Sequence, residues 1–181
     1  MVVRSIPDPG FPGDDGSVSE VVREALAHYA RDPTRHAATL SVLQHARLLV
    51  PVVAVLGDVE HDEEGNVHDK SSDMATVLMA GRDGRSALLA FTGGETMARW
   101  DAECRPVPVT APRAAEAALQ DGASTLLVDV AGPVMFVVEH DDLRELARGS
   151  VLIEVGAGHG WVTPAHRPSH PLLVEKPASP R

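Results

Sequence analysis

Apolar residues near the amino end of the chain recur every three or four positions. This spacing covers residues 18–29 and predicts an amphipathic helix, because it places the apolar side chains on one face. Ser17 and Glu20 stand three positions apart, which is the spacing of a capping box at a helix start. Pro33 follows Asp32 and ends the helix. We therefore predict that the folded part of the chain opens with a helix.

Apolar runs of strand length follow. The longest, residues 48–55, predicts a strand buried on both faces, and Pro51 indicates an edge position or an irregular start. An Asp-Gly pair at 83–84 predicts a hairpin between the apolar runs 74–80 and 86–91. Further strands are predicted at residues 105–109, 126–130, 134–138 and 151–155. Further helices are predicted at residues 34–47, 93–101, 114–120 and 140–148.

Two of these helices carry boundary signals. Thr92 and Glu95 have capping-box spacing before the helix at 93–101. Thr110 is a good N-cap for the alanine-rich helix, and Gly122 lies just beyond its end.

Two segments share the order strand, strand, helix. The first is the hairpin at 74–91 with its following helix, and the second runs from residue 125 to residue 148. We therefore predict an α+β fold, a single domain with a mixed β-sheet built from two ββα-like units plus N-terminal helices. The hypothesis requires that the four strands lie in one sheet.

The ends of the chain differ in composition from its middle. Residues 1–16 are rich in proline, glycine and aspartate, which predicts a flexible lead. Residues 17–155 carry the apolar periodicity and are predicted to form the domain. Residues 156–181 are predicted to be a tail rich in proline and histidine.

The net charge of the chain limits the kinds of molecule that it can bind. The 181 residues include 26 acidic and 16 basic side chains, a net charge of −10, which disfavours nucleic acid and anionic membranes. No run approaches the length of a membrane span, and the first residues lack a signal-peptide core. A single cysteine excludes an intrachain disulfide. We expect a cytoplasmic protein.

A glycine-rich stretch near the carboxyl end is similar to a cofactor loop. Residues 154–160 resemble the first motif of S-adenosylmethionine-dependent methyltransferases. That site also needs a further strand and helix with an acidic residue about 20 positions on. Only 21 residues follow Gly160, and five of them are proline. We therefore predict a strand that ends in a glycine turn, and no cofactor.

Acidic residues between 58 and 69 raise the question of a metal site. An EF-hand starting at Asp58 needs glycine at its sixth place and glutamate at its twelfth, where the chain has Glu63 and Asp69. His61 and His68 have no recurrent zinc spacing. We predict a solvated acidic loop and no metal.

Catalytic motifs are missing as well. Arg105 follows Cys104 and could lower the pKa of its thiol, but nucleophilic catalysis also needs a base and an orienting group. We expect Cys104 to be a small apolar residue at a helix exit. The chain has no nucleophile elbow, P-loop or zinc-protease motif.

An ordered set of segments across residues 34–149 resembles the SseB-like N-terminal domain family of bacterial proteins. The resemblance implies an α+β domain with no established enzymatic activity. The chain differs from the family pattern in the two glycines after Thr92 and in its tail, where some members carry a second domain. The segments that carry the resemblance are residues 48–52, 70–75, 84–92, Glu95, Trp100, 105–109, the alanine-rich helix and 128–133.

Two features are candidate binding residues. Lys70, Ser71, Ser72 and Asp73 form a polar cluster just before a buried strand, although serine and aspartate can also serve only to order their own loop. Trp100 should fold back on the core, but a tryptophan on a surface helix can also anchor an interface.

We expect a non-catalytic binding or scaffolding module, with a protein partner or self-association. The alternative is a small hydrolase or metabolite-binding enzyme that uses the cluster at 70–73 with the acidic loop. A catalyst should gather polar groups in one concave pocket, whereas a binding module should present an apolar patch.

Overall fold

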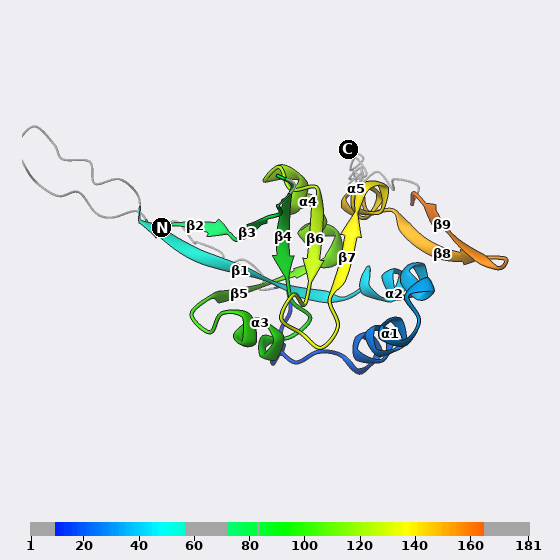
Figure 1. Ribbon diagram of the computed structural model, residues 1–181, viewed down its shortest axis with the longest axis horizontal. Coiled ribbons are helices and arrows are strands. Elements are labelled where there is room, and N and C mark those ends of the chain that lie inside the picture. Colours follow the sequence, from blue (N-terminus) through cyan, green and yellow to red (C-terminus); the bar gives the residue numbers. More distant parts are fainter. Residues whose placement is uncertain (1–9, 57–71, 83, 165–181) are drawn as a thin grey trace, which may run out of the picture.

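The computed structural model describes residues 10–56, 72–82 and 84–164, and it confirms an α+β fold (Figure 1). The helices are α1 (Glu20–Arg31), η1 (Pro33–Arg35), α2 (His36–Leu43), α3 (Gly94–Trp100), α4 (Ala111–Gln120) and α5 (His140–Ala147). The strands are β1 (Arg47–Leu56), β2 (Ser72–Thr76), β3 (Leu78–Ala80), β4 (Ser86–Ala90), β5 (Arg105–Thr110), β6 (Thr125–Val128), β7 (Phe136–Glu139), β8 (Val151–Val155) and β9 (Gly158–Val162). None of the described helices is long and apolar enough to cross a membrane.

A four-stranded mixed sheet with the order β3-β4-β6-β7 forms the centre. Strands β4 and β6 are parallel, and the two outer pairs are antiparallel. Three strands of the two predicted hairpins and the second part of the fourth, β3, therefore lie in one sheet. Two equivalent ββα units are not confirmed, because α5 packs on the face of β4 that carries Leu88 and Ala90, whereas α3 packs with Leu89 and Phe91 on the other face.

Both faces of this sheet are covered, which explains why β4 is almost wholly apolar. One face is buried under side chains from α1, α2, α4 and α5, and the alanines of α4 let that helix lie close to the strands. The other face is covered by Met97 of α3, Cys104 and Trp100. An apolar run without alternation is the expected pattern for such a strand.

The long strand β1 is the centre of a second sheet with the order β2-β1-β5. Two backbone hydrogen bonds of 2.8 Å between Leu49 and Phe91 join this sheet to the end of β4. The edge position predicted from Pro51 is wrong. Pro51 lies opposite Pro106, between the Leu49 bridge and the first β2 partner, so its missing N–H removes no bond from the ladder.

The predicted strand 74–80 is divided between the two sheets. Its first part is β2, which pairs with β1, and its second part is β3, which pairs with β4. Val77 lies at the break, where its carbonyl accepts a hydrogen bond from the Leu89 amide at 3.4 Å. One apolar run therefore connects the two sheets, which hydrophobic periodicity cannot show.

Two predicted capping boxes are wrong. Helix α1 begins after Ser19, and the Ser17 hydroxyl bonds to Asp15 at 2.6 Å instead. Helix α3 begins after Gly93, because the Thr92 side chain is used elsewhere. The cap of α4 is confirmed, since the Thr110 hydroxyl accepts a hydrogen bond from a backbone amide in the first turn.

Folded structure extends beyond both predicted ends of the domain. Arg47 on β1 holds the segment before α1 through an ion pair with Asp14 at 2.9 Å and a hydrogen bond to the Ser17 carbonyl at 2.7 Å. At the other end, residues 156–160, which resembled a cofactor loop, form the turn and start of the β8–β9 hairpin. The predicted glycine turn after a strand is confirmed, and up to residue 164, where the described part of the chain ends, it leads into β9 and into no helix.

Gln44 attaches the β8–β9 hairpin to the domain. Its side-chain amide accepts from the Leu152 N–H at 2.7 Å and donates to the Leu152 carbonyl at 2.8 Å. The pair of bonds replaces a neighbouring strand for this stretch of β8. Gln44 and Leu152 are both 6% exposed, so no water can easily take over these bonds.

We expect Gln44→Ala to lower the free energy of unfolding by about 3 kcal/mol, because it leaves the buried N–H and carbonyl of Leu152 unpaired. Urea denaturation measures the loss. Gln120→Ala is the matched control, since Gln120 is exposed and bonds only to Glu116 at 3.4 Å, and it should change stability by less than about 0.5 kcal/mol. Equal losses in the two variants would contradict a structural role for Gln44.

Candidate functional site

An open groove of about 380 Å³ lies between α1, α3 and the segment that joins β6 to β7. We call it the α1–α3 groove. Its apolar lining is Val18, Leu26, Ala27, Ala30, Pro133 and Val134. Its polar lining is Arg23, Arg31, Thr92, Glu95, Thr96, Arg99 and Asp129. It lies beside the carboxyl ends of the parallel strands β4 and β6, the edge where ligands commonly bind to α/β sheets.

Asp129 ties together the elements at this end of the sheet. It follows β6, is 2% exposed, and accepts hydrogen bonds from the Thr92 amide at 2.9 Å, the Thr92 hydroxyl at 2.6 Å and the Thr96 hydroxyl at 2.6 Å. Its own amide donates to the Ala90 carbonyl at 2.9 Å. One carboxylate thereby fixes the end of β4 and the start of α3.

The backbone at Asp129 is in the left-handed region, with φ at +56°. This conformation is unfavourable for most residues but is tolerated by aspartate, and it turns the chain sharply after β6. Gly132 completes the turn by donating its amide to the Asp129 carbonyl at 2.8 Å. A Cβ at Gly132 would lie 2.9 Å from the Asp129 Cβ and 3.1 Å from its carbonyl oxygen, so no larger residue fits without displacement.

Arginines on two facing helices border the groove. Arg23 pairs with Glu20 on α1, and Arg99 pairs with Glu95 on α3 at 2.5 Å. Arg31 is the last residue of α1. Its guanidinium group makes neither a hydrogen bond nor an ion pair with the described part of the chain. The groove thus combines an apolar floor with guanidinium groups at its rim.

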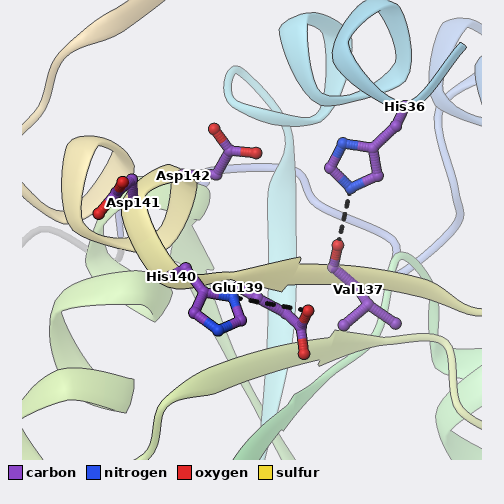
Figure 2. A pocket seen from close by; sticks show the side chains of 6 residues that line it. All are labelled: His36, Val137, Glu139, His140, Asp141 and Asp142. Carbon is purple, nitrogen blue, oxygen red and sulfur yellow. Dashed lines mark hydrogen bonds and ion pairs between the residues drawn. The ribbon is translucent and has the colours of Figure 1, made fainter.

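A second pocket, of about 300 Å³, lies along the outer edge of β7. Figure 2 shows His36 pointing from α2 to the Val137 carbonyl, with Nε2 and the oxygen 2.9 Å apart. Glu139 and His140 lie at the start of α5, where the His140 Nδ1 is 3.6 Å from a Glu139 oxygen. Asp141 and Asp142 complete the lining.

The polar groups of this second pocket are engaged in structural contacts. His36 stacks on Phe136 with ring centroids 4.6 Å apart and covers the free edge of β7. Asp142 accepts a hydrogen bond from the Trp161 indole at 2.9 Å, and Asp141 pairs with Arg144. No group of three metal-ligating side chains lies together among the described residues.

Of the binding residues predicted from the sequence, Lys70 and Ser71 lie outside the described residues. Ser72 and Asp73 begin β2, opposite Leu56 and Val55 of β1. Trp100 ends α3 and packs on Phe91 with ring centroids 5.8 Å apart, in a cluster that includes Met97. Trp100 does not line the α1–α3 groove, and the role of the predicted residues in binding stays a prediction.

Sequence reasoning missed Asp129 and the groove as a site. Asp129 was visible only as part of a turn between two strands, and its partners Thr92 and Thr96 lie 33 to 37 residues earlier. The only local signal was the capping-box spacing at Thr92. It was misleading, because the Thr92 hydroxyl donates to Asp129 instead of capping α3. His36 and Val137 are 101 residues apart, so no sequence window contains the second pocket.

Cys104 has the environment of a structural residue. It is 7% exposed, and its thiol donates a hydrogen bond to Asp101 at 3.3 Å. Burial raises the pKa of the thiol, and the neighbouring carboxylate of Asp101 raises it further. The expectation that Arg105 could lower this pKa is therefore wrong, because burial and the Asp101 carboxylate set its direction and both raise it.

The family model of the SseB protein N-terminal domain matches residues 22–145. The chain belongs to this family. The match begins in α1 and ends in α5, so the SseB domain includes α3, the Asp129 turn and most of the α1–α3 groove. No match was found among curated proteins or among solved structures.

We expect Gly132→Ala to destabilise the SseB domain by about 2 kcal/mol, since the added methyl group overlaps Asp129. Thermal unfolding measures the effect. Gly94→Ala is the control, because a Cβ there meets nothing closer than 3.7 Å and alanine favours the first turn of α3. A Gly132→Ala protein as stable as Gly94→Ala would contradict the close approach described for this turn.

We also expect the Cys104 thiol of the folded protein to react with iodoacetamide at neutral pH at least about tenfold more slowly than glutathione does, because burial and the raised pKa both reduce the accessible thiolate. Mass spectrometry of the intact protein follows the reaction. Unfolding in urea should restore an ordinary rate. A fast reaction in the folded state would reopen the question of a nucleophilic cysteine.

Proposed function

We propose that this SseB-family chain is a non-catalytic binding module, and that it holds a segment of a protein partner in the α1–α3 groove. The observation that carries the proposal is the combination of an apolar floor and an arginine rim in one groove. Interfaces commonly place apolar contacts at the centre of a site and polar groups around them.

The floor of the groove suits aliphatic side chains. Ala27 and Ala30 on α1 are small, so they leave room between that helix and α3. Pro133 and Val134 form the opposite wall, and Pro133 is held in a turn fixed by Asp129. A rigid, preformed wall favours binding because little ordering entropy is lost when the partner docks.

Charge indicates the composition of the partner segment. Three arginines line this groove, but Arg23 pairs with Glu20 and Arg99 pairs with Glu95, so within the described part of the chain Arg31 is the lining guanidinium left without an ion pair. The three hydrogen bonds to Asp129 leave it little capacity to accept more. We therefore infer a partner segment with aliphatic side chains flanked by glutamate or aspartate. The net charge of the chain, −10, argues against nucleic acid and anionic membranes.

Trp100 has a supporting role in this proposal. It anchors the end of α3 on Phe91, and α3 supplies one wall of the groove. The alternative enzyme depends on the cluster at residues 70–73 and on the acidic loop, most of which lie outside the described residues, so it stays an alternative. The apolar lining of the groove is what favours binding.

The test is a titration of the isotope-labelled protein with a 14-residue peptide that has leucines at helical spacing and glutamates elsewhere. We expect amide shifts confined to α1, α3 and the segment between β6 and β7. Arg31→Glu should weaken binding about tenfold, because a rim charge is reversed without loss of an internal ion pair. Arg35→Glu, in η1 and outside the groove, is the matched control and should bind normally.

A second peptide, with lysine in place of every glutamate, tests the charge argument. It should bind at least about tenfold more weakly than the acidic peptide. Equal binding of the two peptides, or shifts centred outside the groove, would contradict the proposal.

A further inference from the structure

The β8–β9 hairpin presents an apolar face that no described residue covers. Figure 1 shows the hairpin at one end of the molecule, and none of its residues lines the α1–α3 groove. Its register places Val151 opposite Val162, Ile153 opposite Gly160 and Val155 opposite Gly158. Directly opposed residues lie on the same face of an antiparallel pair, so one face carries four branched aliphatic side chains and two glycines.

The opposite face of the hairpin is buried against the domain. Leu152 is 6% exposed and lies opposite Trp161, which packs on the main core and donates its indole N–H to Asp142. The apolar face therefore points outward and cannot turn inward. Its exposed fractions are 42% for Ile153, 58% for Val155 and 46% for Val162.

One edge of the hairpin is also open. Gln44 occupies the outer edge of β8 at Leu152, whereas β9 pairs only with β8 among the described strands. Sheets of globular proteins usually have more than two strands, and the open edge of β9 can accept a third. An apolar segment added at β9 would pair with this edge and would contribute side chains to the exposed face.

We propose that the Leu-Leu-Val run at residues 172–174 of the same chain docks on this face as a third strand beside β9. This run is the apolar part of the segment that follows the hairpin. Nine residues, 163–171, separate it from the end of β9 at Val162. Nine connecting residues reach about 30 Å, more than the roughly 17 Å length of a five-residue strand. The connecting sequence contains three prolines, at 164, 168 and 171, and proline is unfavourable inside a helix.

The size of the face favours a tethered segment over a second copy of the chain. Two five-residue strands present a face on the order of 200 Å², whereas a stable interface buries about 800 Å² on each partner. A segment joined by a short connection needs less area, because its effective concentration at the face is in the millimolar range. This proposal is independent of the α1–α3 groove.

The test uses the full chain with a nitroxide label on a cysteine introduced by Lys176→Cys, while Cys104 is buried and stays unlabelled. We expect selective broadening of the Ile153, Val155 and Val162 methyl resonances. Replacement of residues 172–174 by serine should abolish it and should speed hydrogen exchange of the β9 edge amides about tenfold. The double variant Glu175→Ser with Ala178→Ser is the control and should retain both properties.

Three results would overturn the proposal. The first is absence of broadening in the labelled chain, and the second is broadening that survives the serine replacement. The third is broadening that grows with protein concentration together with a dimer in sedimentation, which would assign the face to a second copy.

Discussion

The buried carboxylate of Asp129 is the interaction on which the arrangement of the candidate site depends. It accepts three hydrogen bonds from the residues that follow β4, and the parallel pairing of β4 with β6 brings it to them. A buried carboxylate is costly unless its oxygens are fully bonded, so the position of α3 and the turn at Gly132 are coupled to it. The Asp129 side chain therefore holds α3 directly, and the turn at Gly132 connects Asp129 to the Pro133–Val134 wall of the α1–α3 groove.

The architecture assigns different roles to the two faces of the central sheet. One face is buried by four helices and supplies most of the core, whereas α3 with Trp100 forms a smaller cluster on the other. The groove opens between α1, which covers one face of the sheet, and α3, which covers the other. Small and aliphatic residues line it, and arginines stand at its rim. The guanidinium groups at this groove, Arg31 above all, are the basis of the binding function that we propose for this SseB-family domain.

Local patterns predicted most of the elements. The runs at 18–29, 86–91 and 114–120 became α1, β4 and α4, since each depends on periodicity or on a cap within a few residues. The errors share a cause. Ser17 and Thr92 have the spacing of capping residues, but Asp15 and Asp129 compete for their hydroxyls, and the competitor of Thr92 lies 37 residues away. The candidate binding residues were chosen for local polarity at 70–73 and for an aromatic on a surface helix at Trp100, and Trp100 does not line the groove.

The sequence alone determined the α+β class, the family and the identity of most helices and strands, because these depend on hydrophobic periodicity and on an ordered set of short segments. Only the tertiary structure decided which strands pair, how the run at 74–80 is shared between two sheets, and which side chains meet at Asp129 and at Gln44. The physical reason is that the contacts at Asp129 and at Gln44 join residues 33 to 108 positions apart, and that the run at 74–80 is divided by pairing with two different strands. No local propensity encodes them, and they arise from packing both faces of one sheet at once.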